Sequence, residues 1–209
     1  KLAQIEQDRV VMLAGISHDL RTPLARLRLE TELSVNDDGA REQMAADIDQ
    51  ANAIINKFLD YARPDQTAVI AVVLSDVVNR CVVALKDASD IRLRIDMAPG
   101  LSVLADEVDL IRAISNLLEN ASRYGRSVSS GIAEVDILAR ANGLRVVIEV
   151  RDHGPGVSPG NLLQLTKAFY RGDAARTSAT GAGLGLAIVE KNIQRMGGTL
   201  TLRNRTSGG

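Results

Sequence analysis

The stretch "LAGISHDLRTPLARL", residues 13–27, places leucine and isoleucine at spacings of three and four. This is the period of one face of an α-helix, so the stretch predicts an amphipathic helix with a single apolar stripe. The stripe comprises Leu13, Ile16, Leu20, Leu24 and Leu27. A second row with the same period follows the turn "SVNDDG", and it comprises Met44, Ile48, Ala51, Ile55, Leu59 and Ala62. The sequence therefore predicts an all-α helical hairpin over residues 1–63.

In a hairpin of this kind each helix has one apolar stripe, and the hairpin alone offers little surface to cover it. Pairing of two hairpins into a four-helix bundle is the simplest way to cover it. We therefore expect the first domain to form a dimeric four-helix bundle and the protein to be a homodimer.

Composition limits the classes of protein that the chain can represent. With 209 residues, of which 45% are hydrophobic, the chain is long enough for one large or two small domains. With a formal net charge of −1 the chain has no excess of basic residues, so we expect no nucleic-acid partner. Cys81 is the one cysteine, which excludes an intrachain disulfide. No apolar run approaches the roughly 20 residues of a membrane-spanning helix.

The pattern changes after "YARPDQTA", and we expect a linker at 64–67 and a second domain at 68–209. Strand-like segments alternate there with helical ones, including a helix over about 106–124, a β-hairpin around Asn142 and Gly143, and a helix over 184–196. The segment "GTLTLRN" predicts a last strand. Antiparallel strands with helices gathered on one face predict an α+β layer.

His18 lies almost opposite the apolar stripe of the first helix, so it is not a buried core histidine. An ordinary exposed histidine is the alternative, and its neighbours decide against that. Pro23 should bend the helix within a turn of His18. Asp19 is placed to hold one imidazole nitrogen so that the other is an unprotonated nucleophile, and Thr22 shares the exposed face. His18 is therefore a candidate phospho-acceptor.

The segment "NLLENASRY" places Asn116 and Asn120 one turn apart on one helix face, which Arg123 and Tyr124 continue. An amide oxygen is a hard ligand that suits magnesium, a cation that binds through few protein groups plus phosphates and water. A solvated polar face is the alternative, and these residues alone would favour it.

The segment "RDHGPG" follows a predicted strand. Asp152 is placed there as an acceptor for an exocyclic amine, and Gly154 and Gly156 allow the backbone to approach a flat base. Because Asp-x-Gly-x-Gly is also a common turn, the segment is weak evidence by itself.

The segment "GAGLGLAIVEKN" opens a predicted helix with Gly181, Gly183 and Gly185. Unpaired amides and the positive dipole end of a helix suit phosphate oxygens. The segment lacks the lysine of a Walker loop and the strand of a Rossmann motif. Residues of about 157–182 carry little predicted structure and indicate a nucleotide lid, from which Arg171 and Arg176 reach phosphates.

The motifs "SHDLRTP", "NLLENASRY", "DHGPG", "AFYRGD" and "GAGLGL", in this order and spacing, resemble the H, N, G1, F and G2 boxes of two-component sensor histidine kinases, especially the EnvZ-like ones. The resemblance covers essentially the whole chain. It implies a Bergerat-type ATP-binding sandwich for the second domain, with ATP and Mg²⁺ as ligands, and a protein-histidine kinase with phosphatase activity.

Residue by residue, the resemblance implies that His18 is phosphorylated, that Asp19 is its general base and that Thr22 positions a water for phosphatase activity. It implies that Asn120 holds Mg²⁺, Tyr124 packs on adenine and Asp152 binds the adenine amino group. Implied nucleotide contacts are also Asn116, Arg123, Gly154, Gly156, Arg171, Gly172, Gly181, Ala182, Gly183, Leu184, Gly185 and Leu186.

Ala182 stands where the family commonly has threonine, and the lid is slightly longer than in similar kinases. The family usually continues into a further strand after the final "SGG" and is preceded by a membrane-proximal helix. We therefore expect the cytoplasmic portion of a bacterial inner-membrane receptor, with the receiver domain of an OmpR-like response regulator as partner.

Two other classes of function are open at this point. One is a Bergerat-fold ATPase that hydrolyses ATP to drive a clamp, against which the exposed His18 with Asp19 and Pro23 argues. The other is a dimeric scaffold without catalysis, against which Asn120, Asp152 and the glycines argue.

Overall fold

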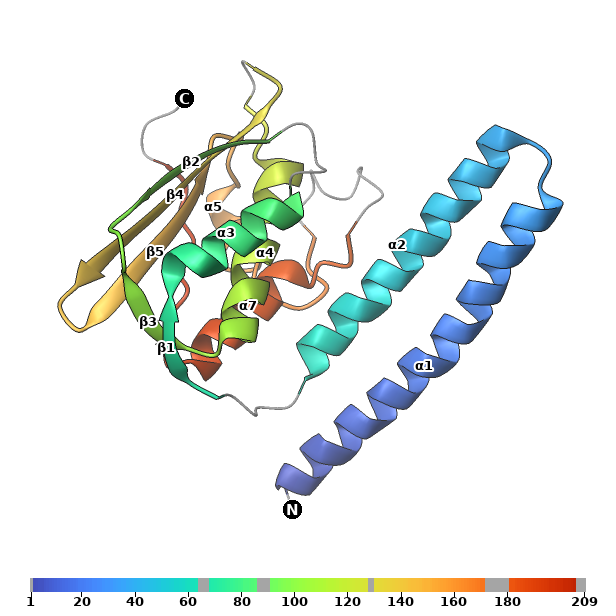
Figure 1. Cartoon of the computed structure of the whole chain (residues 1–209), viewed down its shortest axis with the longest axis horizontal. Coiled ribbons are helices and arrows are strands. Elements are labelled where there is room, and N and C mark those ends of the chain that lie inside the picture. Colours follow the sequence, from blue (N-terminus) through green and yellow to red (C-terminus); the bar gives the residue numbers. More distant parts are fainter. Residues whose placement is uncertain (1, 64–67, 86–90, 128–129, 172–180, 206–209) are drawn as a thin grey trace. The chain divides into compact units, whose positions relative to one another are not determined.

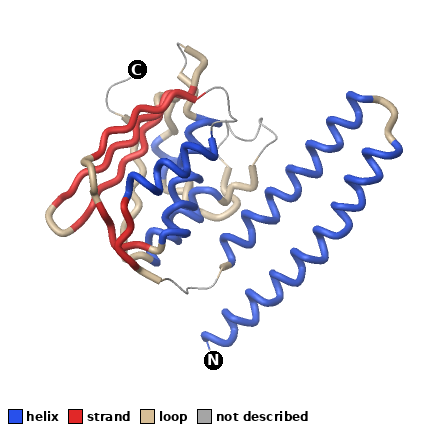
Figure 2. The backbone as a smooth tube through the Cα atoms, in the orientation of Figure 1, coloured by secondary structure: helices blue, strands red, loops and turns tan. Residues whose placement is uncertain are grey.

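The computed structural model describes residues 2–63, 68–85, 91–127, 130–171 and 181–205. The chain divides into two compact units, Lys1–Asp65 with Ser178–Leu184 and Gln66–Thr177 with Gly185–Gly209. A helical hairpin dominates the first unit, and the second mixes helices with strands (Figure 2). The predicted succession of a helical hairpin and an α+β layer is therefore confirmed.

The first unit contains the helices α1 (Leu2–Ser34) and α2 (Asp38–Ala62), which run antiparallel as a hairpin (Figure 1). Asp37 caps α2, because its carboxylate accepts a hydrogen bond from the Ala40 amide at 2.6 Å. Pro23 lies inside α1, and the helix continues past it to Ser34. The Arg28 guanidinium ties the two helices together by binding the Ala45 carbonyl and the Asp49 carboxylate, each at 3.0 Å.

The seam between α1 and α2 does not follow the whole predicted stripe. Ser17 and Thr31 are buried, whereas Ile16, Leu20 and Leu27 are 42%, 46% and 48% exposed. Ser17 and Thr31 lie fourteen residues apart, which is close to four helical turns, so they share one face of α1. In one hairpin α2 covers the edge of the apolar stripe, and these three large side chains of the stripe face solvent.

The second unit contains two sheets. The strands β1 (Ile70–Val73) and β3 (Ser102–Ala105) form an antiparallel pair. The larger sheet has the order β2–β4–β5, with β2 (Ile91–Met97), β4 (Ala133–Asn142) and β5 (Arg145–Asp152). The second unit also contains the helices α3 (Leu74–Leu85), α4 (Glu107–Tyr124), the short α5 (Pro159–Leu162) and α7 (Gly185–Arg195).

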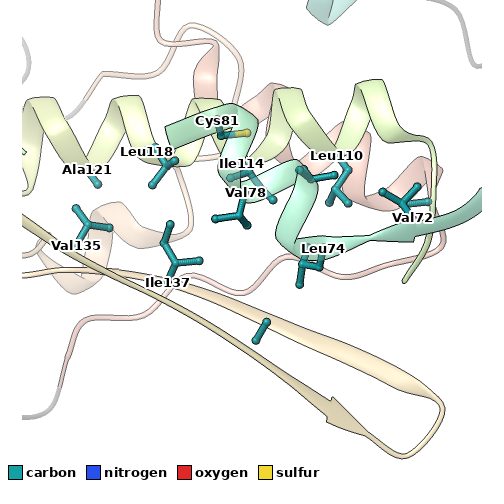
Figure 3. Close-up of a cluster of buried hydrophobic side chains, with 13 residues drawn as sticks. Val72, Leu74, Val78, Cys81, Leu110, Ile114, Leu118, Ala121, Val135 and Ile137 are labelled. Atoms are coloured by element: carbon teal, nitrogen blue, oxygen red, sulfur yellow. The ribbon is translucent and has the colours of Figure 1, made fainter. Parts of the chain in front are cut away.

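The core lies between the larger sheet and the helices on one of its faces (Figure 3). Along β4 buried residues alternate with partly exposed ones, so Val135 and Ile137 point at α4 while their neighbours face the other way. On α4 the residues Ile114 and Leu118, one turn apart, are buried in the same core cluster. The strand pattern and the amphipathic helix thus fix which face of α4 is left for polar residues.

Two expectations about the sheet are wrong. The strands are not all antiparallel, because β2 pairs parallel with β4. The connection between them passes through β3 and α4, and a helix-containing crossover of this kind returns the chain in the same direction. The segment "GTLTLRN" is not a strand in the structure. Side chains hold this part of the chain near β5 instead, with Arg203 bound to Glu149 at 2.9 Å and Arg205 to the Asp152 carbonyl at 3.5 Å.

Cys81 is buried between α3 and α4, where the Ser115 hydroxyl donates a hydrogen bond to its sulfur at 3.4 Å. Burial raises the pKa of the Cys81 thiol, and the Ser115 hydrogen bond only partly opposes this effect. The thiol therefore stays protonated near neutral pH, and Cys81 is a packing residue rather than a nucleophile.

Candidate active site

The phospho-acceptor candidate lies on the solvent side of α1. The side chains of His18 and Asp19 are 83% and 84% exposed, and Nδ1 of His18 is 3.4 Å from Oδ1 of Asp19. The Thr22 hydroxyl donates to the His18 carbonyl at 3.3 Å, which keeps its oxygen on the same face, one turn along the helix. The three residues are thus grouped as predicted, and the contact with Asp19 uses Nδ1 of His18 rather than Nε2.

The polar face of α4 carries the predicted asparagines. Asn116 is 9% exposed, and its Nδ2 donates to the Arg112 carbonyl at 2.8 Å. Its Oδ1 is buried and has no hydrogen-bond partner within the described parts of the chain. A buried amide oxygen without a partner is unfavourable, so this atom marks a place where a ligand or water would bind. Asn120 lies one turn further on and is partly exposed.

The first residue of α7 packs directly on these two asparagines. A Cβ atom added to Gly185 would lie 3.3 Å from Asn116 Oδ1 and 3.3 Å from Asn120 Nδ2. The close approach of the two helices therefore favours glycine at this position. It brings the unpaired amides at the start of α7 next to the polar face of α4, and amides at the start of a helix are suited to phosphate oxygens.

The Asp152 loop packs on the other end of α4. The Gly154 amide donates to Asp152 Oδ1 at 2.9 Å. A Cβ atom on Gly154 would lie 2.7 Å from the Tyr124 carbonyl, and one on Gly125 would lie 2.5 Å from the Asp152 Cβ. These contacts seat Asp152 beside the end of α4, near Tyr124, which is 41% exposed. Gly125 was absent from the predicted site, although its position after "NASRY" marks the helix end.

The other predicted nucleotide contacts are less closely grouped. Arg123 is exposed and Arg171 partly buried, whereas Gly172 and Arg176 lie outside the described residues, together with the rest of the lid segment 172–180. Leu184 is buried, and Ala182 and Leu186 are partly exposed.

Several residues of these loops have unusual backbone conformations. The glycines with positive φ include Gly156, Gly181 and Gly183. Phe169 also has a positive φ, of 65°, which the motif "AFYRGD" did not reveal. An aromatic residue rarely adopts this conformation, so the loop is held there by its surroundings.

The amide oxygen on α4 suits magnesium, which needs few protein ligands, better than it suits a metal ion coordinated by protein side chains alone. Within the described residues no group of three or more His, Cys, Asp or Glu side chains is placed to hold a metal ion. Asn120 supplies one hard amide oxygen, and Mg²⁺ commonly binds through one or two protein groups, substrate phosphates and water. The site therefore fits a magnesium ion that arrives together with a polyphosphate.

Two family models match the chain. Residues 8–67 match the His Kinase A phospho-acceptor domain, and residues 105–209 match the family of histidine kinase-, DNA gyrase B- and HSP90-like ATPases. With both domains and the site geometry present, the chain belongs to the sensor histidine kinases of two-component systems.

Its relatives agree with this assignment. The chain is 34% identical to the sensor protein RstB of Escherichia coli (strain K12) over 212 residues, 95% of this chain and 46% of RstB. It is 30% identical to the signal transduction histidine-protein kinase/phosphatase MprB of Mycolicibacterium smegmatis over 227 residues, 100% of this chain and 44% of MprB. The chain thus spans about half the length of the relatives it matches.

Solved structures give the same fold. The crystal structure of full-length ShkA in complex with AMPPNP matches with a TM-score of 0.70 and 26% identity, covering 89% of this chain and 41% of ShkA. The structure of the mycobacterial sensor histidine kinase MprB matches with a TM-score of 0.52 and 26% identity, over 62% of this chain and 81% of that one.

In the described part of the chain, no helix combines the length and apolarity needed to span a membrane.

The tight contact at Gly154 makes a specific prediction. Gly154→Ala should weaken ATP binding by at least about tenfold, because the added Cβ must displace Asp152 or the end of α4, and small displacements in a binding site have large effects. Gly160→Ala is the matched control, since a Cβ at Gly160 meets no atom within 4 Å. Calorimetric titration with ATP measures both; equal affinities would show that the loop does not position the nucleotide.

Proposed function

We propose that this chain is the catalytic portion of a sensor histidine kinase that transfers the γ-phosphoryl group of ATP to His18 and then to an aspartate of a response regulator. One observation carries the proposal. The exposed His18, in contact with Asp19, occurs in the same chain as a second unit in which Gly185 at the start of α7 packs on Asn116 and Asn120.

The nucleotide is proposed to bind in the second unit along α4. Asp152 accepts a hydrogen bond from the adenine amino group, and Tyr124 packs against the base. The amides at the start of α7 bind phosphate oxygens, to which Arg123 and Arg171 add positive charge. Asn120 holds Mg²⁺, which when bound neutralises charge on the phosphates. The ShkA structure, which contains AMPPNP, supports a nucleotide of this class.

The chemistry at His18 follows from its contact with Asp19. With the proton on Nδ1 facing the Asp19 carboxylate, the lone pair of Nε2 is free to attack the γ-phosphorus. A phosphorus–nitrogen bond forms and the bond to the bridging oxygen of ADP breaks. Asp19 takes the Nδ1 proton, so the phosphorylated imidazole is left neutral. The high exposure of both side chains gives the donor access to Nε2.

The exposed stripe on α1 supports the proposed homodimer. Ile16, Leu20 and Leu27 lie beside the α1–α2 seam and are each more than 40% exposed in one chain. A second hairpin packed on this stripe would bury it and complete a four-helix bundle.

Two parts of the proposal concern the whole protein. We infer that the phosphoryl group passes to the receiver domain of an OmpR-like regulator, and that the chain is the cytoplasmic portion of a protein anchored in the bacterial inner membrane. The relatives named as sensor proteins and sensor kinases, of which the chain spans about half, support this inference. The second activity, dephosphorylation of the regulator, is supported by the name of MprB as a kinase/phosphatase.

Incubation with Mg²⁺ and γ-labelled ATP, followed by addition of a receiver domain, tests the proposed phosphoryl transfer. The label should appear first on this chain and then on the receiver. Release of label only as free phosphate would instead indicate the ATPase alternative.

Thr22 provides a prediction that separates the two activities. Thr22→Ala should leave autophosphorylation nearly unchanged, because attack by Nε2 requires no hydroxyl. It should lower the rate of regulator dephosphorylation by about 10²–10⁴, because the Thr22 oxygen would otherwise orient the attacking water. The measurement is the decay of purified phospho-regulator in the presence of ADP.

Thr22→Ser, which keeps the hydroxyl, is the control and should retain most of the phosphatase rate. If phospho-regulator decayed equally fast with wild-type protein and Thr22→Ala, the assignment of Thr22 would be wrong.

A further inference from the structure

A buried carboxylate lies near the start of α4, away from the asparagines. The side chain of Asp109 is only 3% exposed, and its Oδ2 is 3.5 Å from Nη1 of Arg195, whose side chain is 7% exposed. Arg112 approaches the other oxygen of Asp109 at 3.4 Å from the same helix. Buried carboxylates are rare unless they are paired, so the Asp109–Arg195 ion pair is a specific link between α4 and the last residue of α7.

A second polar contact joins the same two helices. Asn192 of α7 is 2% exposed, and its Nδ2 donates to the backbone carbonyl of Asp109 at 3.3 Å. Together, Asp109, Asn192 and Arg195 form what we term the polar latch.

The polar latch and the glycine contact are equally spaced on both helices. Asn192 lies seven residues after Gly185 on α7, and Asp109 lies seven residues before Asn116 on α4. Seven residues are close to two turns, or about 10.5 Å, so each pair shares one helix face. Two antiparallel helices are thus linked at two points with matching separation, and sliding of α7 along α4 would disturb both.

We propose that the polar latch fixes the register of α7 on α4 and so holds the phosphate-binding end of α7 against Asn116 and Asn120. Its members are positioning residues, and the proposal rests on the ATP-binding function proposed above. Apolar contacts between the helices are non-directional and tolerate small shifts, whereas the ion pair and the amide hydrogen bond specify one alignment. The helices are also close at Gly185, where an added Cβ atom would lie only 3.3 Å from Asn116 Oδ1.

The test uses the full chain and trinitrophenyl-ATP as a fluorescent probe, titrated at several Mg²⁺ concentrations. Asn192→Leu and Arg195→Met remove the two polar contacts while keeping apolar bulk. Each should raise the Kd of the probe about tenfold or more and should also raise the Mg²⁺ concentration at half-saturation, an effect typical of lost supporting contacts around a metal site.

Arg80→Met is the matched control. It also removes an ion pair to an acidic residue of α4, since Arg80 binds Glu107 at 2.6 Å, but the Arg80 side chain is 63% exposed and lies outside the latch. Its Kd should stay within about twofold of wild type, as expected for exposed ion pairs. Arg195→Lys, which keeps the charge, should recover a large part of the affinity.

The readouts distinguish register from stability. A variant that is merely less stable raises the apparent Kd only by the inverse of its folded fraction, which a thermal unfolding curve measures, so a variant that is mostly folded keeps the wild-type Kd. If Arg195→Met fails to fold, Asn192→Leu, which leaves no buried charge unpaired, decides. Unchanged Kd and Mg²⁺ midpoint in Asn192→Leu would overturn the latch alone, whereas absence of probe binding by wild-type protein would overturn the proposed ATP site as well.

Discussion

Replacing His18 with alanine should abolish autophosphorylation while leaving the affinity for ATP within about twofold of wild type. The imidazole is the proposed acceptor, and removal of the nucleophile of a covalent step leaves no substitute for it. ATP affinity is retained because the proposed nucleotide contacts lie on α4, on the Asp152 loop and at the start of α7. The measurement combines transfer of label from γ-labelled ATP with calorimetric titration of ATP.

The second histidine of the chain provides the control. His153 is the other of the two histidines, and its Nε2 lies 3.2 Å from the Asp136 carboxylate in a partly buried position. His153→Gln should therefore still acquire label on His18. Label retained by His18→Ala would contradict the assignment of the acceptor.

Replacing Asn120 with alanine should lower autophosphorylation by at least about 10²-fold, the size expected when a group that stabilises transferring charge is removed. Because loss of an amide ligand weakens binding of the ion, the remaining activity should require a higher Mg²⁺ concentration for half-saturation than in wild type. Asn79→Ala is the matched control, because Asn79 is an exposed asparagine on α3, and it should behave like wild type.

Complementation extends this prediction to the proposed dimer. An Asn120→Ala subunit keeps His18, and a His18→Ala subunit keeps the nucleotide site. If one subunit phosphorylates its partner, mixed dimers of the two variants should acquire label on the Asn120→Ala chain. If wild-type protein acquired label but the mixed dimers did not, the transfer would instead occur within one chain.

The helices and their polar faces could be predicted from the sequence because their periodicity is local. The spacing of Ile114 and Leu118 identified the buried side of α4, and the structure places Asn116 and Asn120 toward α7 as a consequence. The position of His18 opposite the apolar stripe could be predicted in the same way, and the structure exposes it.

Long-range features could not be predicted in this way. The parallel pairing of β2 with β4 depends on the path of the chain through α4, which strand patterns do not record. Ser17 and Thr31 form part of the α1–α2 seam although they are polar, because small side chains fit a close helix contact and the Thr31 hydroxyl is satisfied by the Leu27 carbonyl at 2.8 Å.

The residues around the site were missed for a related reason. Gly125 and Asp109 are ordinary in sequence, and their roles come from partners far along the chain, at Asp152 and Arg195. A motif identifies the residues that touch a ligand, whereas the contacts that place those residues depend on the tertiary structure.

The most direct test of the account is to locate the phosphoryl group after incubation of the wild-type chain with Mg²⁺ and ATP. We predict a phosphoramidate on His18, stable to base, lost in acid, and transferable to a receiver aspartate. An acid-stable phosphate on a hydroxyl side chain, or hydrolysis of ATP without any phosphorylated protein, would contradict the assignment of this chain as a protein-histidine kinase.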